Sequence, residues 1–198
     1  MRPGSPVRGL RLGAVRDDES QAWRNFYPDG LPEDWKLPFY SHYWKDLLFP
    51  AGDWARAVRE TGWLVDVPRD LRLYFELPSL PDDDPTPCGL LAEALEQRLG
   101  GFLLPADAEP PVGLGALPVF RCENGPQLPG ALQVARFAGP GGVVLVLEPE
   151  PDLTLARWRG LLESAAGLLA DARQPVFLRA GPGELENAET ILRLSGLG

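Results

Sequence analysis

The stretch GGVVLVLE, residues 141–148, and the segment after it indicate the fold class most directly. Five consecutive apolar residues, 143–147, follow a glycine pair and are typical of a strand buried on both faces. Asp152 then begins a segment whose apolar side chains recur every three or four residues, which predicts a long amphipathic helix. These side chains are Leu155, Trp158, Leu162, Ala165, Leu169 and Ala172. A further strand is expected at Val176–Leu178, so the order is strand, helix, strand, as in parallel sheets.

The same alternation extends back toward the N-terminus. Further strands are expected at 10–15, 46–49, 71–77, 102–104, 119–122 and 132–137, and helices at 33–44, 53–62, 90–99 and 187–194. We count about seven strands, close to the number that a (β/α) barrel needs, and no linker divides the chain. A complete barrel usually takes about 250 residues. The sequence therefore predicts one α/β domain over residues 1–198, a TIM-barrel-like (β/α) barrel that is shortened or incomplete and largely parallel, with residues 1–10 as a loose arm.

Composition excludes several classes of partner. The chain has 198 residues, of which 44% are hydrophobic, so it can bury a core. Its formal net charge of -9 argues against a nucleic-acid backbone as a partner, because such sites need clustered Lys and Arg. No apolar run approaches the roughly 18 residues of a membrane helix, and the N-terminus lacks the hydrophobic stretch of a signal peptide. We expect a soluble cytoplasmic protein without a nucleic-acid or membrane partner.

The residues that usually carry catalysis are scarce. One histidine, His42, and two cysteines, Cys88 and Cys122, provide neither a multi-histidine metal site nor a disulfide framework or zinc pattern, and no serine lies in a G-x-S-x-G elbow. The run 82–84 of three aspartates lacks the alternating carboxylates of a calcium loop. We expect neither a cofactor nor a metal ion.

A phosphate cradle is a weak alternative. Gly181-Pro182-Gly183 lies between a strand and the last expected helix, where backbone amides can bind phosphate. Glu184 and Glu186 would stand in the place of that phosphate, and short Gly-Pro-Gly runs are common in turns. We therefore favour an ordinary turn here, and likewise at 139–142.

Charged residues follow the expected strands and form the main candidate site: Asp17, Glu76, Asp107, Glu123, Glu148 and Arg179. Parallel strands of a barrel would bring these side chains to one rim. Two carboxylates about 5–10 Å apart could act as acid and base on a glycoside, and several could hold a divalent cation. Arg179 would serve as a salt-bridge partner or an anion clamp. The alternative, which we favour, is a scatter of loop carboxylates among 28 acidic residues.

An aromatic cluster occupies the helix expected at 33–44. Trp35, Phe39 and Tyr43 follow helical spacing, and an aromatic surface could stack sugars or bases. A stripe of this kind belongs more often to the core, so we predict that it is buried. His42 falls off the stripe and is expected to be exposed.

Both ends of the chain resemble the YecE-like family of unknown function. FYPDGLP, residues 26–32, followed by Trp35 and FYS at 39–41, resembles the opening of that family, and residues 13–23 are similar to its first strand and loop. The segments 155–158 and 175–178 and the helix with Asn187-Ala188 are similar to its closing part, whereas 110–145 match poorly. The resemblance implies a TIM-barrel-like fold.

The chain departs from the family pattern at the strand ends. Leu48 and Pro50 stand where the family carries Glu and Asn, and Glu76 stands where it carries Lys. The resemblance therefore implies an uncharacterised YecE-like protein with a non-catalytic binding or accessory role. The alternative is a hydrolase or metal-dependent enzyme that uses the strand-end carboxylates, and it requires those side chains to converge in one cavity.

Overall fold

The computed structural model describes residues 9–59, 61–78, 86–106, 108, 116–169 and 174–197. Eight strands form one closed barrel in chain order. They are β1 (Arg11–Val15), β2 (Asp46–Phe49), β3 (Arg72–Glu76), β4 (Leu99–Leu104), β5 (Val119–Glu123), β6 (Ala131–Gly139), β7 (Gly142–Pro149) and β8 (Pro175–Leu178). Each segment expected to be a strand is a strand, and the structure has eight strands where the sequence suggested about seven. The pairing of β1 with β8 closes the barrel, so the mixed α/β class is confirmed.

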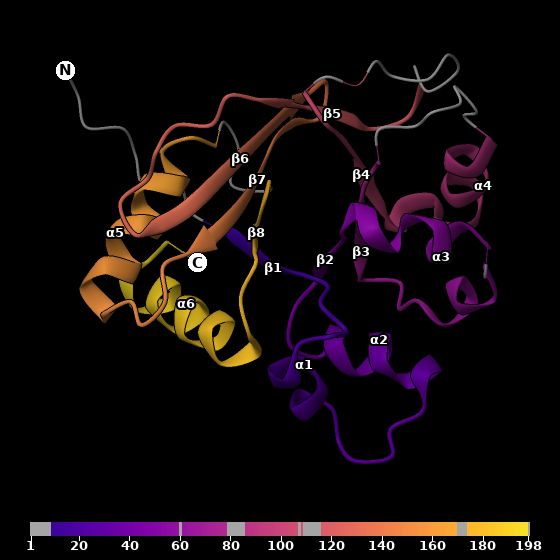
Figure 1. The fold of residues 1–198 in the computed structure, drawn as a ribbon, viewed down its shortest axis with the longest axis horizontal. Coiled ribbons are helices and arrows are strands. Elements are labelled where there is room, and N and C mark those ends of the chain that lie inside the picture. The colour runs from indigo at the N-terminus through magenta and orange to yellow at the C-terminus, as the bar shows by residue number, and fades with distance from the viewer. Residues whose placement is uncertain are drawn as a thin grey trace.

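Helices surround the barrel on several sides (Figure 1). They are α1 (Gln21–Phe26), α2 (Glu33–Ser41), α3 (Trp54–Arg59), α4 (Thr86–Leu95), α5 (Leu155–Ala166) and α6 (Pro182–Ser195), with short 3-10 helices η1 (Ala51–Asp53), η2 (Thr61–Asp66) and η3 (Glu96–Arg98). In the view of Figure 1, α5 and α6 lie on one side, α3 and α4 on the other, and α1 and α2 below. These helices position both cavities described below.

This barrel needs fewer residues than a fully parallel one because one strand, β6, is reversed. Strand β6 runs antiparallel to both β5 and β7, whereas all other neighbouring strands are parallel. An antiparallel pair can be joined by a tight turn, but a parallel pair needs a crossover of about a dozen residues or more. The β6–β7 turn spans only Gly139 to Gly142, and Gly142 adopts a φ of 115° that favours glycine. Reversal of β6 thus closes eight strands in 198 residues.

Apolar side chains fill two layers, one inside the barrel and one between the barrel and its helices. Tyr74 and Phe177 meet inside the barrel with ring centroids 5.0 Å apart, edge to face. Successive strand residues point to opposite sides, so the neighbours of these two side chains pack outward under the helices. On α5, Trp158 is only 3% exposed, as its helical spacing predicts, whereas Leu155 at the helix start is exposed.

The seam between β1 and β2 depends on one glycine and one tyrosine. A Cβ on Gly13 would overlap the carbonyl oxygen of Asp46 and lie 2.7 Å from the Phe177 ring, so only glycine fits there. The Tyr40 hydroxyl donates to the carbonyl oxygen of Asp46 at 2.8 Å and accepts from the amide of Ala14 at 3.0 Å. A side chain of α2 thereby joins the two strands.

Three expectations about helices are wrong in part. Helix α1 was not expected from the sequence, and α6 begins at Pro182 rather than at 187, so Gly181-Pro182-Gly183 is the cap and first turn of a helix. The aromatic stripe is not core: Trp35 is 61% and Tyr43 46% exposed. Instead Tyr40 and Trp44 are buried, because α2 ends at Ser41 and the Tyr40 hydroxyl is required at the β1–β2 seam. His42 is exposed, as predicted.

Candidate functional site

Two of the expected rim residues meet at the carboxyl end of the barrel. Arg179 follows β8 and Glu76 ends β3, and Nη2 of Arg179 lies 2.5 Å from Oε1 of Glu76. Strands β1 and β2 separate β8 from β3, so this ion pair crosses the mouth rather than joining neighbouring strands. Glu76 therefore has its charge compensated by an arginine.

The other described rim residues have surroundings of their own, although Asp17 lines one cavity together with Arg179. The side chain of Glu123 pairs with Arg136 of β6, and it points away from the interior because its neighbour Cys122 packs against the interior cluster. Oδ1 of Asp17 accepts the amides of Glu19 and Ser20 at 3.2 and 3.0 Å, which fixes it in the loop after β1. Glu148 follows the inward-facing Val146 at strand spacing and is half-buried. Asp107 lies outside the described residues, as does the run 82–84.

A cavity of about 480 Å³ opens at this mouth, between β1, β8 and the start of α6. Its charged lining includes Asp17, Arg179 and Glu184. Oε2 of Glu184 accepts the amide of Gly181 at 2.8 Å, so the helix start is capped by the chain's own carboxylate. This is the position at which a phosphate would bind a helix N-terminus.

A second cavity, of about 410 Å³, lies outside the barrel and is called the groove below. It lies over the β1–β2 seam, between α1 and α2 on one wall and α3 and η2 on the other. Its lining includes the buried Leu47 and Ala57 and the half-buried Tyr27, Leu37 and Trp63. The groove thus has an apolar interior, and four aromatic side chains line it: Trp23, Tyr27, Tyr40 and Trp63.

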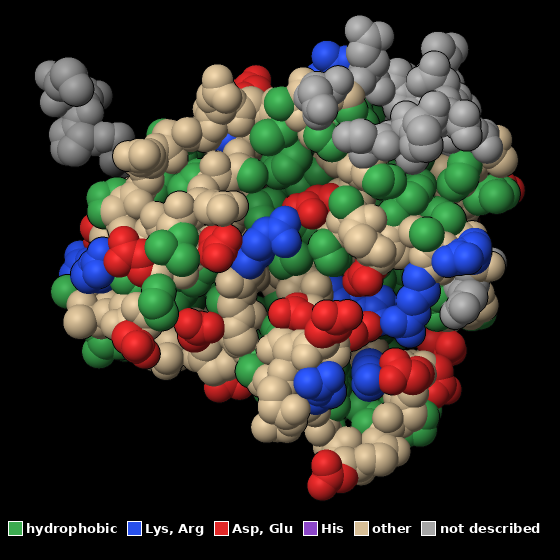
Figure 2. All heavy atoms as spheres, viewed as in Figure 1, with side chains coloured by type: hydrophobic (Ala, Val, Ile, Leu, Met, Phe, Trp, Pro, Cys, Tyr) green, Lys and Arg blue, Asp and Glu red, His purple; other side chains and the backbone are tan. Residues whose placement is uncertain are grey.

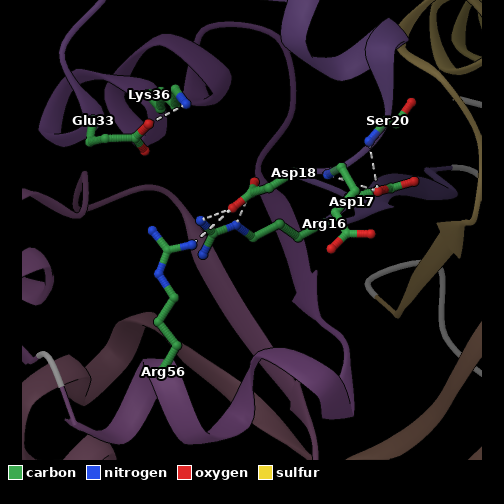
Figure 3. A network of polar contacts seen from close by, with 8 residues as sticks. Arg16, Asp17, Asp18, Ser20, Glu33, Lys36 and Arg56 are labelled. Carbon is green, nitrogen blue, oxygen red and sulfur yellow. Dashed lines mark hydrogen bonds and ion pairs between the residues drawn. The ribbon is translucent and has the colours of Figure 1, made fainter.

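Charged side chains surround the groove (Figure 2 shows them gathered over α1, α2 and the edge of α3). Figure 3 shows the guanidinium groups of Arg16 and Arg56 approaching Asp18 from different elements. Asp18 accepts from Nε of Arg16 at 2.9 Å and also from Nη2 of Arg16, whereas Nη1 of Arg56 is 3.4 Å away. On the other wall, Nζ of Lys36 lies 2.5 Å from Oε1 of Glu33. Arg16 also stacks over the ring of Phe49, 4.9 Å from its centroid.

Tyr27 shows how the groove differs from bulk water. Burial, together with the charges of Asp18 and Glu33, raises the pKa of the Tyr27 hydroxyl to about 12, because each disfavours a phenolate. The ammonium group of Lys36 lies 5.5 Å from the centroid of the Tyr27 ring. A polar group placed in this groove is therefore in a less solvated surrounding than at the open surface.

A buried carboxylate lies at the opposite, amino end of the barrel. Asp46 is 1% exposed, forms an ion pair with Arg11 and lies 3.5 Å from Nε of Arg72. Burial raises the pKa of the Asp46 carboxyl, and the nearby Arg11 guanidinium opposes that rise. Its Oδ2 atom has no hydrogen-bond partner among the described residues. The guanidinium groups of Arg11 and Arg72 compensate the charge of this buried carboxylate.

Metal ligands are not gathered in the described ranges. There, no group of three or more His, Cys, Asp and Glu side chains is arranged to hold a metal ion. Cys88 is buried and Cys122 is half-buried. Burial raises the pKa of the Cys122 thiol, and the charge of Glu76 raises it further.

Sequence reasoning missed the groove. The polar run Arg16-Asp17-Asp18 was visible at the end of the first strand, but nothing local connects it with Arg56 or Trp63. The one available signal was the FYPDGLP phrase and the helix after it, which supply Tyr27, Lys36 and Leu37 to one wall.

No protein-family model matches this chain, and neither a curated protein nor a solved structure is significantly similar to it. Within the described part of the chain, no helix combines the length and apolar character needed to cross a bilayer. Function must therefore be argued from the cavities and their side chains.

Proposed function

We propose that this chain is a non-catalytic binding protein whose small-molecule ligand occupies the groove. The observation that carries the proposal is a cavity of about 410 Å³ with apolar and aromatic walls and a charged margin. Ligand sites typically have volumes of about 300–1,000 Å³, are mostly apolar and contain a few polar groups that orient the ligand. The groove has this volume and an apolar interior, and the charged side chains of its margin supply the polar groups.

The state of the rim residues supports a binding role over the enzymatic alternative. An acid–base pair needs two carboxylates that are free to exchange protons with a substrate. Glu76 is held by Arg179, Glu123 by Arg136 and Asp17 by backbone amides. A hydrolase or metal-dependent reading would have to recruit Glu148, or Asp107 outside the described residues, and it stays the alternative.

We also propose that the chain is a divergent, cytoplasmic YecE-like protein with a TIM-barrel-like fold in which one strand is reversed. The closed eight-stranded barrel and its parallel β1–β5 segment are consistent with that descent. The residues that carry the resemblance, 26–32 and the helix after them, also border the groove through Tyr27 and Leu37. The family resemblance and the proposed ligand site would then involve the same part of the chain.

Binding of a neutral apolar dye tests the proposal. N-phenyl-1-naphthylamine should bind saturably with one site per chain and quench tryptophan emission, because Trp23 and Trp63 line the groove. Leu37→Trp fills the groove and should abolish binding. Val65→Trp adds the same side chain at an 82% exposed position that does not line the groove, and it should leave binding intact.

Thermal melting shows whether each variant is folded before its titration is compared. Should Leu37→Trp melt early, Tyr27→Ala removes part of a wall without adding volume and should weaken binding. Dye binding that is equal in Leu37→Trp and Val65→Trp, or that never saturates in the wild-type chain, would contradict the proposal.

A further inference from the structure

We infer that the ligand of the groove is an organic anion, and that Arg56 and Arg16 receive its anionic group at the position that Asp18 holds in the structure. This inference rests on the proposed function and extends it to the chemical class of the ligand. A carboxylate, sulfonate or phosphate on an apolar body shares the required chemistry, because each presents oxygens to a guanidinium fork.

Asp18 forms more hydrogen bonds with Arg16 than with Arg56. Arg16 contacts both carboxylate oxygens of Asp18 through Nε and Nη2, in the fork geometry of a bidentate pair. Arg56 reaches only Oδ2, at 3.4 Å, and its side chain is 55% exposed. A guanidinium has five N–H donors. Among the described residues, most N–H donors of Arg56 therefore have no protein partner and stay accessible to a ligand while the side chain lines the cavity.

A second arginine of the groove, Arg24, likewise has few protein partners among the described residues. Nη2 of Arg24, on α1, contacts only the neutral side-chain oxygen of Gln21, at 3.4 Å, in the described part of the chain. Lys36 differs, because Glu33 neutralises it at 2.5 Å. Arg24 and Arg56 lie on opposite walls, so an anion between them would meet positive charge on both sides. The apolar interior beside them strengthens such an interaction relative to bulk water.

A ligand could displace the Asp18 side chain from the two arginines at little cost in stability. It is exposed and lies in the loop between β1 and α1, and an exposed ion pair contributes little to stability. Loss of its contacts would leave Arg16 and Arg56 facing the groove without the carboxylate that now bonds both, and with Asp53 as a nearby negative charge. A ligand anion would then restore the contacts that the chain supplies to itself. Asp18 thus acts as an internal competitor that lowers ligand affinity.

Carboxylates also border the groove, and they would favour a cationic ligand instead of an anionic one. Asp34 and Asp66 are exposed at its margin, and Asp53 lies close enough to Arg16 and Arg56 to feel both charges. A cationic ligand would use Asp34 and Asp66 and would gain nothing from removal of Asp18. Substitution of the arginines should therefore weaken binding of an anionic ligand and should not weaken binding of a cationic one.

Two dyes with the same ring system separate the charge from the apolar body. 8-Anilinonaphthalene-1-sulfonate carries an anionic group, whereas N-phenyl-1-naphthylamine is neutral. Arg56→Gln should weaken binding of the sulfonate dye about ten-fold or more, the effect of one charge-assisted hydrogen bond, and should leave the neutral dye unchanged. Asp18→Asn should strengthen binding of the sulfonate dye, by about three-fold or more, because it removes the internal competitor.

Matched controls lie beside both positions. Arg59→Gln removes an arginine of the same helix that does not line the groove, and Glu19→Gln removes a carboxylate next to Asp18 in sequence. Neither should change the affinity for either dye. Leu37→Trp should block both dyes, which assigns the signal to the groove. Added salt should weaken the sulfonate dye alone, a readout that needs no variant to fold.

The outcomes separate this inference from the function on which it rests. Saturable binding of both dyes that Leu37→Trp abolishes, but that ignores Arg56→Gln and Asp18→Asn, would overturn the anion assignment and leave the binding role standing. Weaker sulfonate binding in Asp18→Asn would overturn the competitor role of Asp18. Absence of saturable binding of either dye would overturn both proposals.

Discussion

Arg179 and Glu76 are 103 positions apart in sequence, yet Nη2 of Arg179 lies 2.5 Å from Oε1 of Glu76 across the carboxyl-end mouth of the barrel. The pair joins β8 to β3, which are not neighbours in the sheet. An inward-facing carboxylate at this end is where a barrel enzyme would place an acid or base. Here Arg179 already forms an ion pair with Glu76, which compensates the charge of that carboxylate.

The first prediction concerns Cys122, whose thiol is affected by the charge of Glu76. Glu76→Gln removes that negative charge and leaves Arg179 free, so the pKa of the Cys122 thiol should fall, although burial continues to raise it. Alkylation of Cys122 by iodoacetamide, followed by mass spectrometry, should shift to lower pH. Glu123→Gln, an outward-facing neighbour, is the control. The same pH–rate profile in Glu76→Gln and in the wild-type chain would contradict the electrostatic coupling.

The second prediction concerns the β1–β2 seam. Tyr40→Phe removes the hydroxyl that bonds Ala14 and Asp46, and it leaves a buried amide and a buried carbonyl oxygen without that partner. We expect the free energy of unfolding to fall by about 1–3 kcal/mol. Tyr43→Phe, at a 46% exposed position, should change it by less than about 0.5 kcal/mol. Equal losses in the two variants, measured by urea denaturation, would refute the role of the hydroxyl.

The third prediction is alkaline destabilisation through Tyr27. The pKa of its hydroxyl is about 12 in the folded chain and 10.0 without that environment, so the unfolded chain loses this proton first as pH rises. The free energy of unfolding should therefore fall with increasing pH between about 10 and 12. Tyr27→Phe should lessen that fall by roughly 1–2 kcal/mol. Denaturant melts across this range check the slope, and parallel slopes would contradict it.

The fourth prediction separates the binding role from a metal-dependent enzyme. A cation bound to the native state would raise the melting temperature by mass action. We expect no rise with millimolar magnesium, calcium, manganese or zinc, because Glu76 and Glu123 are already paired with arginines. A rise with one cation that Glu148→Gln abolishes would favour the enzymatic alternative.

Much of the fold could be predicted from local patterns, and the site only in part. The strand at 143–147 and the buried face of α5 around Trp158 follow from apolar periodicity, which the sequence displays directly. The aromatic helix was misjudged, because spacing alone cannot say where α2 ends or that Tyr40 is required at the seam. The described rim residues lie at or near strand ends, as predicted, whereas Asp107 is outside the described residues, and the ion-pair partners were not predictable.

Sequence by itself determined the eight strand segments, the alternation with helices over most of the chain and the scarcity of histidine and cysteine chemistry. Tertiary structure alone decided the reversal of β6, the outward direction of Glu123 and the meeting of Arg16, Asp18 and Arg56 at the groove. The physical reason is one of range. Periodicity and propensity act over a few neighbouring residues, whereas these ion pairs and cavities depend on how the closed barrel places side chains that are distant along the chain.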